Sequence, residues 1–184
     1  MPGVGKLTVA QALVSTSDEH ALDRFVLVDN HLISNGILRV TPLDERGMVP
    51  DRAWDLVAEV RERVLTAIVE LSPPGWSFVF TNVVIEDDLR KGESVDVLRQ
   101  LAKTRGGRYV PVVLTCAPDE HRRRVVAPGR AERQKWTDPD GVAALMAEQP
   151  LAPPDDPTRI DLDITDRAPD ATAQAILAHL TTLD

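Results

Sequence analysis

The chain has 184 residues, of which 43% are hydrophobic and 27% charged, and its formal net charge is −8. This length is enough for one domain with a buried core, and the acidic balance argues against nonspecific binding to nucleic acid or anionic membranes. Cys116 is the single cysteine, which excludes an internal disulfide, and its apolar neighbours favour a buried, inert thiol. No apolar stretch approaches membrane-spanning length and no signal-peptide pattern is visible, so we expect a cytoplasmic protein.

The first residues contain the glycine-rich pattern Pro-Gly-Val-Gly-Lys-Leu-Thr, from Pro2 to Thr8. A phosphate-binding loop reads Gly, four residues, Gly-Lys, then Ser or Thr. Gly5 and Lys6 match its second half, and its first glycine would fall before Met1. Glycines let successive backbone N–H groups turn toward an anion, and the start of the following helix adds positive charge. The pattern predicts an anion site whose lysine reaches the outer phosphates; the alternative is an N-terminal tail with a chance match.

Two features depart from that pattern. Leu7 occupies the place of the hydroxyl that normally contacts Mg²⁺, and Thr8 follows one position later. A strand should also lead into the loop, but only Met1 and Pro2 stand before Gly3. We therefore hypothesise that the natural chain has about five to ten further residues upstream, ending in an apolar strand and a glycine. As given, the chain should show four parallel strands with a gap or a rearranged pairing where that strand belongs.

Helical and extended patterns alternate along the rest of the chain. Apolar spacing and capping residues predict helices over 6–17, 51–71 and 94–103, from Pro118, over 138–148, and from Pro169. Short apolar runs predict strands at 25–28, 77–80, 109–115 and 160–163, and residues 32–50 and 149–158 are expected to be loops. The predicted buried stripe of the long helix consists of Trp54, Val57, Val60, Val64, Ile68 and Leu71.

Strands that alternate with helices favour a parallel sheet covered on both faces. In such sheets, ligands bind beyond the carboxyl ends of the strands. Polar residues fall at these ends: Asp29-Asn30-His31, Thr81-Asn82 and Thr115. This agreement supports a functional interpretation of the glycine-rich loop.

The order of these parts resembles the small P-loop kinases, which include shikimate, gluconate and adenylate kinases and chloramphenicol phosphotransferase. The string Pro-Gly-Val-Gly-Lys-Leu-Thr-Val-Ala, with Asp-Asn-His-Leu after the next strand, is most similar to a bacterial subgroup of these kinases. The resemblance covers nearly the whole chain. It implies a single α/β domain over residues 1–184, with the three-layer P-loop NTPase fold and strand order 2-3-1-4-5, the first strand missing.

The resemblance also implies roles for particular residues. The ATP phosphates would be held by Gly3, Val4, Gly5, Lys6, Leu7 and Thr8. Lys6 would act in catalysis, and Asp29 would accept the proton of the acceptor hydroxyl or orient it; the alternative for Asp29 is a turn residue. His31 would bind substrate or serve as a hydrogen-bonded structural histidine. Asn82 stands where some relatives have an aspartate, and Leu7 stands where a hydroxyl is usual. The resemblance therefore does not identify the residue that binds Mg²⁺.

Charged segments complete the implied site. Six cations lie close together in this acidic chain: Arg122, Arg123, Arg124, Arg130, Arg133 and Lys135. In the kinases, a lid brings arginines onto the phosphates, where the planar guanidinium suits phosphate oxygens. We expect a mobile lid at about 120–137, in which Arg124 and Arg133 bind the nucleotide and Arg130 takes part in catalysis. The alternative, a solvated helix face, would hold for at least two of the six cations. Glu86, Asp87 and Asp88 are expected in a solvated acidic loop.

Three functions are compatible with these features. The first is an ATP-dependent phosphotransferase that moves the γ-phosphate to a hydroxyl or phosphate of a small molecule, with ATP and Mg²⁺ as cofactors. The second is a catalytically impaired ATP-binding module, in which Leu7 and Asn82 mark a lost metal site. The third is a non-enzymatic interaction domain that keeps the fold. The sequence favours the first, with neither nucleic acid nor membrane as a partner, and it names neither the acceptor nor the oligomeric state.

Overall fold

The computed structural model describes residues 1–19, 24–45, 48–84, 90–128, 130, 137–148 and 151–183. The strands of this part of the chain are β1 (Phe25–Asp29), β2 (Ser77–Thr81), β3 (Val112–Thr115) and β4 (Ile160–Asp163). Its helices are α1 (Lys6–Glu19), α2 (Asn30–Leu38), α3 (Asp51–Leu71), α4 (Arg90–Thr104), α5 (Pro118–Val125), α6 (Pro139–Glu148) and α7 (Pro169–Thr181). The predicted α/β class is therefore confirmed. None of the helices in these ranges is long and apolar enough to cross a lipid bilayer.

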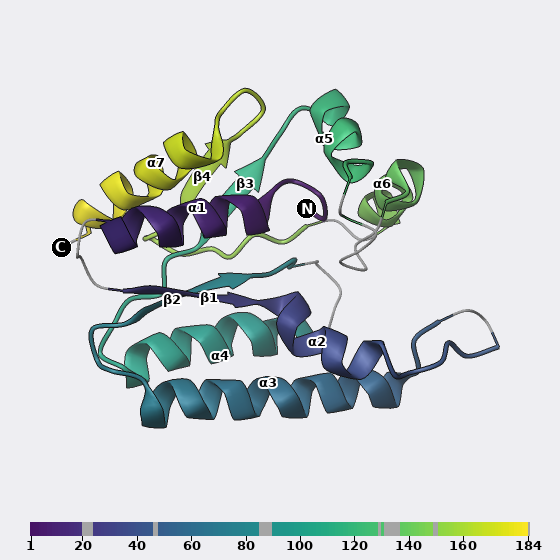
Figure 1. Ribbon diagram of the computed structural model, residues 1–184, viewed down its shortest axis with the longest axis horizontal. Coiled ribbons are helices and arrows are strands. Elements are labelled where there is room, and N and C mark those ends of the chain that lie inside the picture. Colours follow the sequence, from purple (N-terminus) through teal and green to yellow (C-terminus); the bar gives the residue numbers. More distant parts are fainter. Residues whose placement is uncertain are drawn as a thin grey trace.

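The strands form two parallel pairs instead of one continuous sheet (Figure 1). β1 pairs with β2 so that Asp29 lies opposite Thr81, and β3 pairs with β4 so that Thr115 lies opposite Asp163. Among the described residues, β2 and β3 share no ladder. A cavity of about 860 Å³ is lined by residues of both strands. The expected pattern of four parallel strands with a central gap is thus observed.

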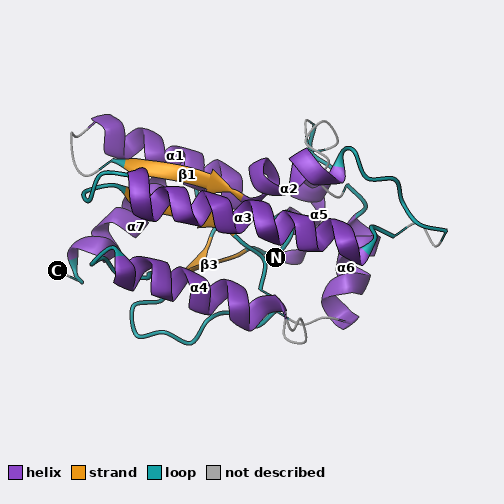
Figure 2. Ribbon diagram, turned by 90° about the horizontal axis from the view of Figure 1, so that it is seen from below, coloured by secondary structure: helices purple, strands orange, loops and turns teal. Residues whose placement is uncertain are grey.

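Helices cover both sides of the strands, which gives three layers (Figure 1). On one side α1 packs along α7 and also contacts β1 and β2. On the other side α3 and α4 lie next to each other, as the second view confirms (Figure 2). Arg105, just after α4, closes the end of α3 by donating from Nη1 to Ile68 O and from Nη2 to Pro73 O, both at 2.6 Å. The carbonyls at the end of a helix lack partners of their own, so this side chain ties the two helices together.

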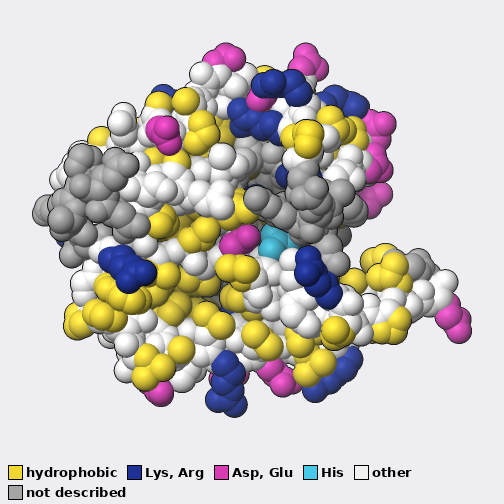
Figure 3. Space-filling view, in the orientation of Figure 1, with side chains coloured by type: hydrophobic (Ala, Val, Ile, Leu, Met, Phe, Trp, Pro, Cys, Tyr) yellow, Lys and Arg dark blue, Asp and Glu magenta, His cyan; other side chains and the backbone are white. Residues whose placement is uncertain are grey.

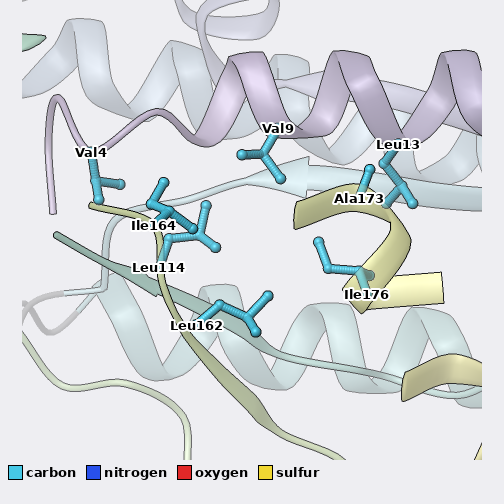
Figure 4. Packing of buried hydrophobic residues seen from close by; sticks show 8 residues of the cluster. All are labelled: Val4, Val9, Leu13, Leu114, Leu162, Ile164, Ala173 and Ile176. Carbon is cyan, nitrogen blue, oxygen red and sulfur yellow. The ribbon is translucent and has the colours of Figure 1, made fainter. Parts of the chain in front are cut away.

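The buried residues form two clusters. One joins the glycine-rich loop, α1, β3, β4 and α7, and its members are Val4, Val9, Leu13, Leu114, Leu162, Ile164, Ala173 and Ile176 (Figure 4). The other joins β1, α2, α3 and α4 through Val28, Ile33, Val57, Ile68 and Leu101. Burying a large aliphatic side chain contributes roughly 1.5–3 kcal/mol relative to leaving it exposed. Val4 belongs to the first cluster with no exposed surface, so the loop is anchored in the core.

Some predicted elements were wrong. Residues 30–38 form helix α2 where a loop was expected. Its polar residues and Gly36 are weak helix formers, and the helix is held by packing against α3. β3 covers only the last four residues of the predicted strand 109–115, because Pro111 before it has no N–H to donate to a ladder. α4 begins at Arg90, so Ser94 lies within the helix and does not cap it.

The buried stripe of α3 is narrower than the pattern indicated. Ala53, Val57 and Ile68 are its buried residues. By contrast, Trp54 is 37% exposed and Leu71 is 79% exposed. Val57 follows Ala53 by four residues and Ile68 follows Val57 by eleven, about three helical turns, so these three share one narrow face. Apolar side chains to either side of that face and at the helix end reach solvent.

Candidate functional site

The glycine-rich loop wraps around the N-terminal end of α1. Gly3 and Gly5 have φ angles of +86° and +118°, a region that side chains with a Cβ rarely adopt. The helix begins directly after them at Lys6, and Val9 donates its N–H to Gly5 O at 3.1 Å. Lys6 Nζ donates to Met1 O at 2.7 Å, across the base of the loop. This combination of positive φ angles, helix start and lysine is suited to an anion.

Helix α5 holds the loop in place. The His121 ring donates from Nε2 to Pro2 O at 2.6 Å, and Arg124 donates from Nη1 to Val4 O at 2.7 Å. The loop also packs directly on the helix, because a Cβ added to Gly3 would lie 2.7 Å from Cγ2 of the buried Val125. Two hydrogen bonds and one close contact therefore fix the loop from a segment more than a hundred positions away in the sequence.

Arg124 lies at the centre of this attachment. Its Nη2 donates to Ile164 O at 2.7 Å, at the end of β4, and its Nε donates to Glu120. Hydrogen bonds from Arg123 and Arg124 hold the pKa of the Glu120 carboxyl below its ordinary value, so Glu120 stays charged. Arg124 thus joins the loop, α5 and the carboxyl end of β4.

A second set of polar residues follows the carboxyl ends of β1 and β2. Asp29 is 7% exposed, and its Oδ1 accepts a hydrogen bond from Thr81 Oγ1 at 2.6 Å. Asn30 Nδ2 donates to Asn82 Oδ1 at 2.7 Å. Arg61 of α3 donates from Nη2 to Asn30 Oδ1 at 3.3 Å. The parallel pairing places these groups at one edge, as expected from the sequence, and the Thr81 hydroxyl orients the carboxylate.

The two sets of residues border the same cavity. Lys6 from the loop, Thr81 and Asn82 from the end of β2, and Thr115 from the end of β3 all line it. The structure therefore brings the loop lysine and the polar groups at the ends of β2 and β3 to one opening, whereas Asp29 at the end of β1 is not among the residues that line it. The described residues include no group of three or more His, Cys, Asp or Glu that could hold a metal ion.

Other predicted residues have less defined positions. Leu7 is half-buried, and Thr8 is exposed. Arg130 is described and partly buried, and this burial lowers the pKa of its guanidinium. Arg133, Lys135 and most of the predicted lid lie outside the described residues, as does the acidic loop of Glu86, Asp87 and Asp88. Burial raises the pKa of the Cys116 thiol, in accord with an unreactive cysteine.

Comparison of the whole chain with known proteins identifies its fold. No protein-family model and no curated protein matches the chain. The APS kinase of Mycobacterium tuberculosis, solved in complex with AMPPNP and APS, is 17% identical and has a TM-score of 0.61. The structural match covers 98% of this chain and 93% of the APS kinase chain. A candidate kinase from Chloroflexus aurantiacus is 15% identical and has a TM-score of 0.59, and the match covers 99% of this chain and 92% of that kinase chain. The chain has the fold of the small P-loop kinases.

Within this P-loop kinase fold, sequence reasoning missed two residues that support the site. His121 was not singled out, although it is 9% exposed and bonded to the loop. Arg61 was not singled out either, although burial lowers the pKa of its guanidinium and its buried Nε has no hydrogen-bond partner among the described residues. A histidine and an arginine on helix faces give no sequence pattern by themselves, so only the packed structure reveals them.

Proposed function

We propose that the protein is an ATP-dependent phosphotransferase that moves the γ-phosphate of ATP to a hydroxyl or phosphate of a small molecule. The observation that carries this proposal is the loop of Gly3 and Gly5, with positive φ angles, at the start of α1 and beside Lys6. The kinase architecture of the solved structures supports it. The APS kinase was solved with AMPPNP, a nucleotide analogue, and with a small-molecule substrate.

The nucleotide phosphates would bind at the loop. Backbone N–H groups of Gly3 to Thr8 and the helix start would face the phosphate oxygens, and the Lys6 ammonium would exchange the Met1 carbonyl for an outer phosphate. We propose Arg130 and Arg133 as further phosphate ligands. Arg124 was predicted in the same role, but here its guanidinium donates to the backbone of the loop and of β4. Its support for the proposal is therefore indirect, because it fixes the loop.

The acceptor hydroxyl would lie at Asp29. A carboxylate has several lone pairs, so the single hydrogen bond from Thr81 leaves acceptor capacity for a substrate proton. Thr81 fixes the carboxylate, and Asn30, Asn82 and Arg61 form a hydrogen-bonded chain beside it. This environment would position the hydroxyl, accept its proton during attack on phosphorus, and return that proton to solvent after transfer.

Mg²⁺ would neutralise phosphate charge when bound. In such sites it keeps several waters and uses only one or two protein ligands besides the phosphates, so a cluster of three acidic residues is not required. Candidate oxygen ligands on this chain would be the hydroxyl of Thr8, which is exposed, and the carboxylate of Asp29.

The test is release of ADP from ATP and Mg²⁺ by the purified protein, with a panel of small hydroxyl-bearing and phosphorylated metabolites. We expect acceptor-dependent ADP release above the rate without acceptor. Lys6→Ala should abolish it, and Lys103→Ala, which changes a lysine at the far end of α4, should leave it intact. ADP release that Lys6→Ala does not reduce would contradict the proposal.

A catalytically impaired ATP-binding module is the second candidate. Leu7 in place of a hydroxyl and the engagement of Asn82 with Asn30 favour it. This alternative predicts ATP binding without ADP release for any acceptor in the panel, and its affinity for ATP should be the same with and without Mg²⁺.

A further inference from the structure

Arg61 is a charged residue on the buried face of α3. Ala53, Val57 and Ile68 are the buried residues of this helix. Arg61 follows Val57 by four residues, about one helical turn, so it lies on the same face, which packs against α2. An amphipathic helix normally places apolar residues on such a face. A local pattern that is broken in this way is typical of a functional position.

The guanidinium of Arg61 has few partners in the described part of the chain. There its single hydrogen bond runs from Nη2 to Asn30 Oδ1 at 3.3 Å, and its buried Nε has no partner. A guanidinium carries five N–H donors, so most of these donors are unsatisfied by the described residues. A partly buried charge is costly unless an anion pairs with it. This guanidinium therefore lacks a counter-charge that its position requires.

Asp29 does not supply that counter-charge. Its carboxylate accepts the hydrogen bond from Thr81 Oγ1 at 2.6 Å and stands at the N-cap position of α2, whose positive end favours it. No ion pair joins Asp29 to Arg61 in the described part of the chain. Asn30 follows Asp29 in the sequence and accepts the hydrogen bond from Arg61. Two groups of opposite charge thus lie close to Asn30 without neutralising each other.

These groups lie where a small molecule has access. Asn30, Arg61 and Asn82 are all half-buried, so part of each side chain remains at the surface. In the space-filling view, a histidine lies beside an acidic side chain over the carboxyl ends of β1 and β2, with a basic side chain next to them (Figure 3). The end of this strand pair therefore presents both signs of charge to solvent.

We propose that Arg61 binds an anionic group of the acceptor, so that the acceptor is a small hydroxy acid or a phosphate ester with a free hydroxyl. The planar fork of a guanidinium suits the oxygens of a carboxylate and of a phosphate equally. With the hydroxyl at Asp29 and the anion at Arg61, the molecule would be held at two points, which orients the hydroxyl for attack. A neutral alcohol would leave the Arg61 charge unpaired and would bind more weakly. The inference rests on the proposed phosphotransferase function and names the substrate class of that site.

Calorimetric titration tests the anion site without ATP. The probes are glycerate, glycerol phosphate and neutral glycerol, each added to the wild type, to Arg61→Met and to Arg63→Met, which changes an exposed arginine of the same helix. We expect the wild type to bind at least one of the two anions about 10- to 150-fold more tightly than Arg61→Met does. Arg63→Met should match the wild type, and glycerol should show no dependence on Arg61.

The same titrations identify the anion and contain the result that would overturn the proposal. The carboxylate and phosphate probes show which of the two groups the site prefers. The glycine-rich loop is the same in all three proteins, so anions bound there do not contribute to the difference between them. Equal affinities of the wild type and Arg61→Met for both anions would overturn the proposal.

Thermal unfolding separates a binding role from a structural one. Methionine follows the same buried path without a charge, so the Tm of Arg61→Met should stay within about 1 °C of the wild type or rise. Arg61→Lys keeps the charge without the planar fork and should recover only part of the anion affinity. A fall in Tm of more than about 3 °C in Arg61→Met would assign Arg61 to the support of Asn30 and contradict the proposal.

Turnover distinguishes this inference from the phosphotransferase proposal itself. In the ADP-release assay the active acceptors should be anionic, and Arg61→Met should raise the KM for the acceptor about 10- to 150-fold while the KM for ATP is unchanged. Turnover of neutral acceptors with the same KM in Arg61→Met would overturn the anion site alone. Anion binding that depends on Arg61, without ADP release for any acceptor, would contradict the phosphotransferase proposal alone.

Discussion

Replacement of Gly3 by alanine should destabilise the protein through two separable effects. The first is backbone strain, because a φ of +86° costs an alanine about 1–2 kcal/mol. The second is a clash, because the new Cβ would lie 2.7 Å from Val125 Cγ2 and 3.2 Å from His121 Nε2. Val125 has no exposed surface and cannot move aside freely, so this overpacking adds about 1–3 kcal/mol. The expected total loss of unfolding free energy is about 2–5 kcal/mol.

Two other glycines provide matched controls. Gly106 has a φ of +69° with nothing within 4 Å of an added Cβ, so Gly106→Ala should show the strain alone, about 1–2 kcal/mol. Gly36 lies within α2 without positive φ and without neighbours, so Gly36→Ala should stabilise the protein by about 0.5–1 kcal/mol. Urea unfolding, followed by circular dichroism, measures all three variants.

A double-mutant cycle then isolates the contact with α5. Val125→Ala removes the Cγ2 atom that Gly3→Ala would strike, so the double variant should be more stable than the sum of the single effects by about 1–3 kcal/mol. The reasoning would be refuted if Gly3→Ala cost no more than Gly106→Ala and the cycle gave no coupling. That result would mean that the loop does not pack against α5.

Three further predictions follow from the site and its charges. Asp29→Asn should leave ATP affinity unchanged while turnover of an identified acceptor falls by about two to four orders of magnitude; turnover near wild type would make Asp29 a turn residue. In the folded protein the pKa of the Glu120 carboxyl lies below its ordinary value of 4.5. The charged carboxylate therefore stabilises the folded state above pH 4.5, and this contribution is lost as the pH falls through the folded pKa. Glu120→Gln should flatten the pH dependence of the unfolding free energy in urea below about pH 4.5. The Met1 amine, which faces Lys6 and Cys116, has a pKa of about 5 in the folded protein against an ordinary value of 8.0. Between pH 8 and pH 5 the unfolded chain therefore binds a proton that the folded chain does not. The free energy of unfolding should decrease from pH 8 to pH 5, by about 4 kcal/mol at most. An Nα-acetylated protein should lack this decrease, and an equal decrease in both forms would exclude the amine as its origin.

The sequence predicted the elements whose patterns are local. Short apolar runs located β1, β2 and β4, and the apolar spacing between Asp51 and Leu71 located α3 with its observed bounds. α2 was missed because its stability comes from contact with α3 and not from helix propensity. The gap between β2 and β3 was predicted by a negative observation, namely that two residues before Gly3 cannot form a strand.

The site was predictable only in part, because the sequence reveals local patterns and not contacts between distant segments. The glycine-rich pattern and the polar residues after the strands indicated which segments meet, and Thr81 does hold Asp29. The attachment of the loop to His121 and Arg124 joins residues more than a hundred positions apart, and no local pattern encodes it. Arg124 was predicted as a phosphate ligand from its place in a basic run, and that role stays a prediction; its hydrogen bonds to backbone carbonyls of the loop and of the end of β4 have no signal in the sequence.

Calorimetric titration of ATP into the wild-type protein and into Lys6→Ala tests the central claim most directly. We predict measurable binding by the wild type and an affinity loss of about 10- to 150-fold in the variant, the equivalent of a lost charge-assisted hydrogen bond of about 1.5–3 kcal/mol. The same titration of Lys103→Ala should match the wild type. Equal ATP affinity of the wild type and Lys6→Ala, or no binding by a wild-type protein that unfolds cooperatively, would contradict the assignment of the loop as a nucleotide site.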